Sequence, residues 1–246
     1  MINIKDLDQK SPVAEAYRTV RTNISFSDID NDLKTILFTS TKQNEGKSTV
    51  IANVAYAFAK LENSKILLMD LDLRNPSAHK MFAVSNTYGL MDHLKNNRPL
   101  EKCTHKIEDG LDVLPTGMMP PNPSEILSSK KIIEFLQNIK EEYDYIFIDA
   151  PPVGVVSDAS IISKYIDGVM YIVGANETDI NHAQVAIENL KKVDANIIGA
   201  VLNKYNTNDV SYGYYGYYYE EDNAPKGRRA KKSKKGFLNK LSNGFR

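Results

Sequence analysis

The chain has 246 residues, of which 42% are hydrophobic and 25% are charged, a composition typical of a soluble globular protein. The formal net charge is zero, but residues 226–246 carry nine Lys or Arg and no acidic residue, so residues 1–225 carry −9. The single cysteine, Cys103, excludes an intramolecular disulfide and favours a reducing compartment.

The first predicted element is a helix over residues 11–24, where Ser11 suits the N-cap and Pro12 the first helical position. Apolar β-like runs then alternate with helical patterns. We expect strands at 35–41, 65–71, 111–114, 145–149, 168–173 and 197–202, and helices at 48–61, 124–143, 158–165 and 179–192. The strands are continuously apolar, which indicates that both faces of a sheet are covered. The alternation predicts an α/β fold with a doubly wound, mostly parallel sheet and helices on both faces.

A phosphate-binding motif lies between the first predicted strand and the next helix. Residues 41–49, TKQNEGKST, match GxxxxGK[ST] at every fixed position except the first, where Thr41 replaces glycine. Gly46 would let the backbone approach a phosphate, Lys47 would reach the terminal phosphates, and Ser48 would ligate Mg²⁺. The alternative is a solvated loop that matches the motif by chance. The predicted strand before it and helix after it favour a nucleotide site instead. The candidate nucleotide-binding residues here are Asn44, Glu45, Gly46, Lys47, Ser48 and Thr49.

Acidic residues end two of the predicted strands. Asp70 and Asp72 lie in ILLMDLDLR, and Asp149 ends YIFID. Because ligands bind beyond the carboxyl ends of parallel strands, we expect these carboxylates to converge on the phosphate loop. There a carboxylate can hold Mg²⁺ or its waters, or accept a proton from an attacking hydroxyl. The structural alternative for each is a helix N-cap at a strand–helix turn.

Tyrosines are concentrated at residues 212–219, where six of the chain's fourteen tyrosines lie within eight positions. Two glycines interrupt the run, which makes it a poor core strand. Accessible phenol hydroxyls can instead accept phosphoryl groups, each adding about two negative charges. The candidate phosphoacceptors are Tyr212, Tyr214, Tyr215, Tyr217, Tyr218 and Tyr219.

In combination these motifs resemble one known family. EGKST, ILLMDLDLR, YIFIDAPP, EAYRTVRTNI, PPNPSEILSS and the terminal tyrosines are similar to those of the bacterial tyrosine kinases of capsule and exopolysaccharide synthesis. The likeness covers about residues 11–219. It implies a P-loop NTPase-like kinase domain over residues 1–205, with ATP and Mg²⁺. It also implies phosphoryl transfer to the chain's own tyrosine cluster and to proteins of polysaccharide synthesis.

The resemblance further implies roles for the site residues. The residues it marks as catalytic are Lys47, Asp70, Asp72 and Asp149, and those it marks as metal ligands are Ser48, Asp72 and Asp149. Asp70 and Asp72 would be paired carboxylates that organise the metal and activate the phenol, and which of them acts as base stays open. Asn203 matches an adenine-contacting asparagine of related ATPases, with a turn residue at a strand end as the alternative.

Assembly and partners also follow from the resemblance. The chain looks like the Gram-positive type, in which the cytoplasmic kinase is separate from a membrane-embedded activator that regulates polysaccharide chain length. A cognate tyrosine phosphatase would reverse the modification. Glu15, Arg18 and Arg21 match a pattern that joins neighbouring subunits of a ring in this family, although a solvated charged helix face is the alternative. A ring would present one subunit's tyrosines to the next subunit's site.

Two other functions stay open. Lys42 sits where partition and cell-division ATPases of the same superfamily carry a lysine that crosses a dimer interface, so a surface-cycling ATPase is the runner-up. Chance in a surface loop is the interpretation of Lys42 that we favour. A third possibility is a regulatory nucleotide-binding subunit whose tyrosines another kinase modifies. The tyrosine cluster favours the kinase but does not exclude this third function.

The basic tail, residues 226–246, follows a tyrosine-cluster segment at 206–225 and combines Lys and Arg with a few apolar residues. It is interpreted as a flexible tail, an anchor on an anionic membrane surface, or a nucleic-acid contact. Nucleic acid is the weakest of these, because no recognition motif accompanies the charge. No apolar run of 18 residues and no signal-peptide pattern occurs, so we expect a cytoplasmic protein held at the inner face of the membrane through its activator.

Overall fold

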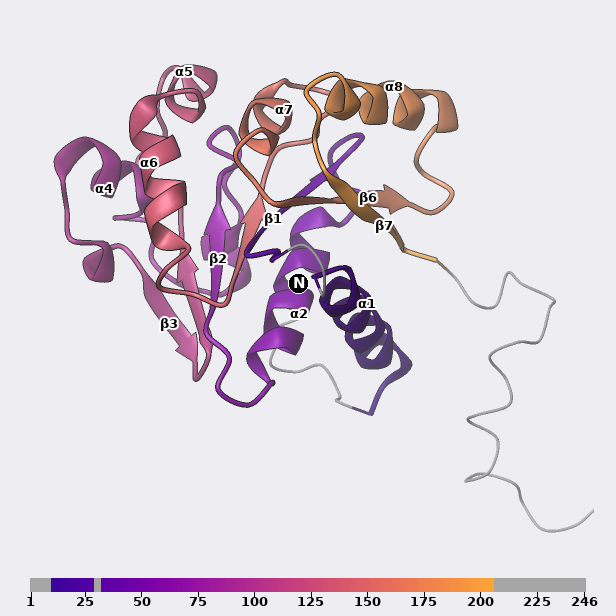
Figure 1. Cartoon of the computed structure of the whole chain (residues 1–246), viewed down its shortest axis with the longest axis horizontal. Helices are drawn as coiled ribbons and strands as arrows, with labels where there is room; N and C mark the ends of the chain where they lie inside the picture. Colours follow the sequence, from indigo (N-terminus) through magenta and orange to yellow (C-terminus); the bar gives the residue numbers. More distant parts are fainter. Residues whose placement is uncertain (1–9, 29–31, 206–246) are drawn as a thin grey trace, which may run out of the picture. The chain divides into compact units, whose positions relative to one another are not determined.

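One sheet of seven strands organises this computed structural model, which describes residues 10–28 and 32–205. The strands lie in the order β3-β4-β2-β5-β1-β6-β7 (Figure 1), and all neighbours are parallel except β3 and β4. Their bounds are β1 Thr35–Ser40, β2 Ile66–Asp70, β3 His105–Glu108, β4 Leu111–Leu114, β5 Tyr145–Asp149, β6 Gly168–Gly174 and β7 Ile197–Asn203. The doubly wound, mostly parallel α/β fold expected from the sequence is confirmed.

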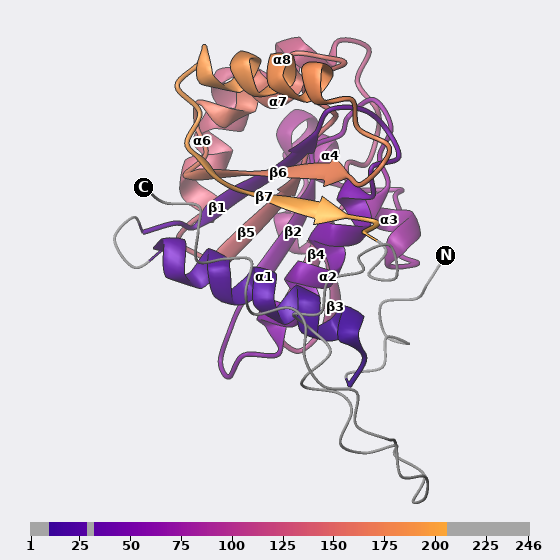
Figure 2. The same ribbon diagram turned by 90° about the vertical axis from the view of Figure 1, so that its right-hand side faces the viewer.

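Helices cover both faces of this sheet. Their bounds are α1 Pro12–Asp28, α2 Lys47–Ala59, α3 Ala78–Met81, α4 Leu90–Asn96, α5 Pro123–Leu127, α6 Lys130–Ile139, α7 Asp158–Ser163 and α8 Ile180–Lys191, with a 3₁₀ turn at Leu100–Lys102. Figure 2 shows α1 and α2 on one side of the strands and α7 and α8 on the other. No helix among the described residues has the length and apolarity that a bilayer crossing needs.

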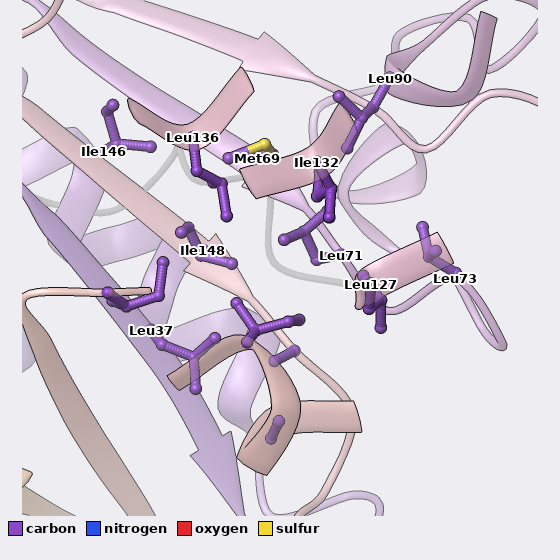
Figure 3. Close-up of a cluster of buried hydrophobic side chains, with 14 of the residues drawn as sticks. Leu37, Met69, Leu71, Leu73, Leu90, Leu127, Ile132, Leu136, Ile146 and Ile148 are labelled. Carbon is purple, nitrogen blue, oxygen red and sulfur yellow. The ribbon is translucent and has the colours of Figure 1, made fainter. Parts of the chain in front are cut away.

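Alternate residues of every strand except the edge strand β3 pack into two separate hydrophobic cores. In β1, Leu37 packs with residues of α4 to α8, whereas Ile36 and Phe38 pack with residues of α1 to α3. All six residues of β1 are buried, as expected for a strand of a sheet that is covered on both faces. Figure 3 shows part of the first core, in which Leu37, Met69, Leu71, Leu73, Leu90, Leu127, Ile132, Leu136, Ile146 and Ile148 lie together.

The helix expected over residues 124–143 is in fact two helices, α5 and α6, so its predicted continuity was wrong. Ser128 ends α5, and Ser129 has an extended backbone as the N-cap of α6. The Ser129 hydroxyl accepts a hydrogen bond from Ile132 N at 3.5 Å. Serine favours such a break because its side chain satisfies an N–H group at the start of a new helix.

Three elements, β3, α3 and α4, were not predicted, and neither was the 3₁₀ turn at Leu100–Lys102. β3 pairs antiparallel with β4 through a turn in which Gly110 has a φ of 84°. Its sequence, HKIE, is polar and lies at the sheet edge, so it lacks the apolar run of a central strand. The short helix α4 fills one core with Leu90, Met91 and Leu94, a pattern too brief to stand out in the sequence.

Candidate active site

The phosphate loop, residues 41–49, joins β1 to α2 at the carboxyl edge of the sheet. Asn44 and Gly46 have φ angles of 66° and 85°. The N–H groups in the first turn of α2 have no carbonyl partner within the helix, so this end can bind an anion. A cavity of about 230 Å³ opens here, lined by Ser40, Lys42, Gln43, Asn44, Gly46, Lys47, Ser48, Thr49, Asp72, Asn75, Ser77 and Pro152.

Thr41, at the motif position that usually holds glycine, connects the phosphate loop to β6. Its side chain is 5% exposed, and its hydroxyl lies 2.7 Å from the hydroxyl of Tyr171 on β6. The loop is thereby fixed to the neighbouring strand, which accounts for the departure from the glycine pattern at this position.

Asp149, at the end of β5, joins several groups at the base of the cavity. Its side chain is 1% exposed, and Lys47 Nζ forms an ion pair with Oδ1. Ser48 Oγ donates to Oδ2 at 2.8 Å, and Ser77 Oγ donates to the same oxygen at 3.3 Å. The structure thus brings together three residues singled out in the sequence and adds Ser77, which no motif marks.

Asp72 follows β2 and lines the cavity, with 8% of its surface exposed. Its Oδ1 accepts a hydrogen bond from Asn75 N at 2.9 Å. Burial raises the pKa of Asp72 above its ordinary value, although the nearby charge of Lys47 opposes that rise. Asp72 is therefore a carboxylate at the cavity wall whose affinity for a proton is increased.

Asp70 is fully buried and does not line the cavity. Its carboxylate accepts hydrogen bonds from three backbone N–H groups, those of Asp72 at 3.1 Å, Ser77 at 2.8 Å and Ala78 at 2.9 Å. Burial, together with repulsion from Asp149, raises the pKa of Asp70 to about 7. The two acidic residues after β2 therefore differ, because Asp70 shapes the loop while Asp72 faces the cavity.

Glu45 also serves the loop and is not part of the cavity wall. Its side chain is fully buried, and Oε2 accepts a hydrogen bond from Lys42 N at 2.9 Å. The Thr178 hydroxyl donates to Oε1 and accepts a hydrogen bond from Gly174 N at 2.9 Å. This carboxylate therefore connects the phosphate loop to the segment between β6 and α8.

Asn203, at the end of β7, lies against the phosphate loop. Its Nδ2 donates to Glu45 O at 2.8 Å. Gly46 has a φ of 85°, which favours glycine, and a β-carbon there would lie 2.0 Å from the same Nδ2 and displace the Asn203 side chain. Asn203 thus supports the loop in addition to any contact it makes with a base.

Two exposed lysines connect the loop to Glu177. Lys204 Nζ donates to Asn44 O at 2.5 Å and forms an ion pair with Glu177 at 2.8 Å. Lys42 Nζ donates to Glu177 O at 2.6 Å. The lysine that matched a dimer-crossing lysine of partition ATPases is therefore bound within its own chain.

Arg74 forms a polar cluster for which the sequence predicted no role. Its Nε donates to Asp158 Oδ2 at 2.7 Å, and its Nη2 donates to Asp158 Oδ1 and to Ser124 Oγ, both at 3.0 Å. The Asp158 side chain is fully buried, so the bidentate pair compensates a desolvated carboxylate. The cluster joins the loop after β2 to α5 and α7, and its only sequence signal is an arginine two residues after Asp72.

The residues predicted to join subunits lie on α1. Arg18 pairs with Glu15 at 2.7 Å on the exposed helix face, whereas Arg21 Nη1 donates to Ala57 O of α2 at 2.9 Å. Arg21 therefore also holds α1 on α2. The tyrosine cluster at 212–219 and the basic tail lie outside the described residues.

The oxygen atoms at the cavity fit Mg²⁺, a hard cation. Ser48 and Asp72 line the cavity, and Asp149 lies directly behind Ser48 and accepts its hydrogen bond. Mg²⁺ is typically held by one or two carboxylates together with substrate phosphates. No group of three or more His, Cys, Asp or Glu within the described ranges forms a metal cluster of its own. The donor set therefore suits a magnesium ion that binds together with a nucleotide.

Comparisons with known proteins agree with this geometry. The matching family model is ParA, described as NUBPL iron-transfer P-loop NTPase, over residues 32–241. Tyrosine-protein kinase YwqD of Bacillus subtilis is 39% identical over 211 residues, which cover 85% of this chain and 89% of the relative. Tyrosine-protein kinase CpsD of Streptococcus agalactiae is 35% identical over 219 residues, covering 88% and 94%. The kinase domain of the Escherichia coli tyrosine kinase ETK has a TM-score of 0.78 at 28% identity, covering 87% of this chain and 85% of that domain.

Proposed function

Since the chain belongs to the bacterial tyrosine-protein kinases, within the ParA-like P-loop NTPases, we propose that it transfers the γ-phosphoryl group of ATP to its own tyrosines at residues 212–219. The observation that supports this best is the cavity where the phosphate loop, Asp72 and the Lys47–Asp149 pair meet. Through this activity the chain would regulate capsular or exopolysaccharide synthesis and export.

The phosphate loop would bind the nucleotide through its backbone N–H groups and Lys47. Lys47 must leave Asp149 to reach the phosphates, and the phosphate charge would compensate the lysine in place of the carboxylate. Mg²⁺, held by Ser48 with Asp72 and Asp149, would neutralise charge on the phosphoryl group in transfer. Most of the catalysis is then positioning and charge compensation.

Asp72 is our candidate for the group that accepts the phenol proton. It lines the cavity, and its raised pKa makes it a better proton acceptor near neutral pH than an ordinary carboxylate. The phenol oxygen would form a bond to the γ-phosphorus as the bond from that phosphorus to the β,γ-bridging oxygen breaks. Asp70 would hold the loop that carries Asp72, through its hydrogen bonds to backbone N–H groups.

Transfer would take place between copies of the chain. Asn203 and Tyr212 are nine residues apart, a reach of at most about 30 Å when extended, which is compatible with delivery to a neighbour. Glu15, Arg18 and Arg21 would contribute to the subunit interface of a ring. A membrane-embedded activator would bring the chain to the inner face of the membrane, a phosphatase would reverse the modification, and the basic tail would add contact with anionic lipid.

The test incubates the purified full chain with MgATP, with and without the cytosolic segment of its activator, and maps phosphate by mass spectrometry. We expect phosphotyrosine within residues 212–219 in the intact chain. A Lys47→Met chain should show none, because it lacks the phosphate-binding amine. Absence of phosphotyrosine even with the activator segment would reject the kinase proposal and revive the surface-cycling ATPase.

A further inference from the structure

A second cavity opens near the carboxyl end of β4. It has a volume of about 330 Å³, within the range of ligand-sized pockets, and lies between α4, the loop after β4 and the start of α5 and α6. Figure 1 shows α4, α5 and α6 grouped on one side of the fold. Its apolar lining, here called the methionine groove, consists of Met91, Leu94, Met118, Met119, Pro120, Pro121 and Ile126.

Two methionines of this groove are poorly covered by the described residues. Met118 is 49% exposed and Met119 is 59% exposed. Neighbouring apolar side chains that stay in water typically mark a surface for a partner. Methionine suits such a surface because its flexible thioether adapts to different shapes and makes favourable contacts with aromatic rings.

The methionine groove is adjacent to the phosphate cavity. Glu125 lines the groove, and Ser124, the preceding residue, accepts a hydrogen bond from Arg74 at 3.0 Å. Asp72 and Asn75, on either side of Arg74 in sequence, line the phosphate cavity. The Arg74 cluster therefore ties the loop that carries Asp72 and Asn75 to the start of α5, which carries Glu125, so a peptide in the groove would lie on the side of the fold that faces the site of transfer.

The charges around the groove favour an acidic ligand. Lys95 and Lys131 are exposed and line it, against the single carboxylate of Glu125. Lys131 Nζ also donates to Leu94 O at 3.2 Å, which holds the lysine at the rim. An occupant with aromatic rings and negative charges would match both the lining and the rim.

We propose that the methionine groove docks residues 211–222 of a second copy of this chain. This segment, SYGYYGYYYEED, combines six tyrosines with three acidic residues and no basic residue. Its rings match the methionines and its carboxylates match Lys95 and Lys131. The basic segment 226–246 is a poor occupant, because its nine positive charges would face those lysines. The inference rests on the proposed function, in which this segment is the phosphoryl acceptor.

Docking would raise the local concentration of phenol groups beside the phosphate cavity without taking part in the chemistry. Damage to the groove should therefore raise the KM for a peptide acceptor while kcat and the KM for ATP stay unchanged. A merely structural defect would instead change all three.

The first test measures binding without nucleotide. A fluorescein-labelled peptide of residues 208–223 is titrated with the full chain and followed by fluorescence anisotropy. The Met118→Glu/Met119→Glu chain should bind at least tenfold more weakly than the unaltered chain. The control Val185→Glu, at a 60% exposed residue of α8, should bind like the unaltered chain. A labelled peptide of residues 226–246, titrated in the same way, should bind at least tenfold more weakly than the 208–223 peptide.

Two results would overturn docking in the groove. One is unchanged peptide affinity in the double variant, and the other is equal binding of the basic peptide. A charge-reversed Lys95→Glu chain gives a second reading, with weaker binding and a smaller effect of added salt expected. If the Lys95→Glu chain binds the peptide with the affinity and salt dependence of the unaltered chain, attraction between the rim lysines and the acidic residues of the peptide is rejected.

The second test adds MgATP together with the cytosolic segment of the activator and separates this inference from the proposed function. In the double variant we expect about a tenfold higher KM for the peptide and unchanged kcat. Phosphate transfer with an unchanged KM would reject docking and leave the kinase proposal intact. Binding in the groove without any phosphate transfer would retain docking and reject the kinase proposal.

Discussion

Lys47 and Asp149 form a buried ion pair at the base of the phosphate cavity, with the lysine 8% and the carboxylate 1% exposed. A nucleotide has to replace the carboxylate as the partner of this lysine. The cost of that exchange is limited, because Ser48 and Ser77 still donate hydrogen bonds to Asp149. Asp149 therefore neutralises the charge of Lys47 when the cavity holds no phosphate. When a nucleotide binds, a phosphate takes the place of Asp149 as the partner of the lysine.

A double-mutant cycle tests this pairing. Lys47→Met leaves a buried carboxylate without its cation and should lower the free energy of unfolding by on the order of 3 kcal/mol in nucleotide-free buffer. Adding Asp149→Asn should recover most of that loss, because no unpaired charge remains. Urea denaturation gives the four free energies, and additive effects of the two changes would contradict a direct interaction.

At the scale of single residues, the sequence predicted the functional residues that belong to a recognisable motif. The phosphate-loop motif identifies Lys47 and Ser48. Asp149 is identified because ligands bind at the carboxyl ends of parallel strands. Ser77 and the bond from Asn203 to Glu45 were not predictable, because each depends on how two distant loops meet in space. The different surroundings of Asp70 and Asp72 also required the structure, since both follow the same strand.

At the scale of elements, Asp167 fastens the start of β1 to the turn before β6. Its Oδ2 accepts hydrogen bonds from Lys34 N at 3.1 Å, Thr35 N at 2.8 Å and Thr35 Oγ1 at 2.7 Å, and its Oδ1 pairs with Lys140 Nζ at 2.5 Å. Burial alone would raise the pKa of Asp167, but the hydrogen bonds from Lys140 and Thr35 outweigh it and lower that pKa. The charged form is therefore the one that the fold stabilises.

Asp167→Asn should lower the free energy of unfolding by about 2 kcal/mol at pH 7. A lowered pKa contributes stability above the ordinary value of the carboxyl group and loses it as the pH falls through the folded value. The difference between the two chains should therefore shrink below about pH 4. Urea denaturation at pH 7 and pH 3.5 measures it. The control is Asp194→Asn at an exposed position, and a constant difference at both pH values would contradict the assignment.

Most elements, but not all, could be predicted from the sequence. The strands with buried apolar runs and the helices with clear caps appear close to their expected ranges. The helix expected over 124–143 failed at Ser129, where a side-chain cap outweighs the continuing helical pattern. The edge strand β3 gave no apolar signal, because only one of its sides meets another strand.

At the scale of the whole molecule, the charge asymmetry links the tyrosine cluster to the basic tail. Six phosphates would add roughly −9 to −12 next to a tail of +9, and Tyr219 and Lys226 are only seven positions apart. Each basic residue near anionic lipid contributes about 1 kcal/mol of binding. Phosphorylation should therefore compete with the membrane for the tail.

Co-sedimentation with vesicles that contain phosphatidylserine measures this competition. The unphosphorylated chain should sediment with them, the phosphorylated chain should do so much less, and neutral vesicles should retain neither form. Equal sedimentation of both forms with the anionic vesicles would reject the link between phosphate and lipid.

The most direct test of the account mixes two full chains that each lack one half of the reaction. The donor chain keeps its site but has Phe in place of all six tyrosines at 212–219, and the acceptor chain keeps its tyrosines but carries Lys47→Met. With MgATP and the activator segment, mass spectrometry should find phosphotyrosine on the acceptor chain only when the donor chain is present. An acceptor that stays unmodified in the mixture, while the unaltered chain phosphorylates its own cluster, would contradict transfer between copies.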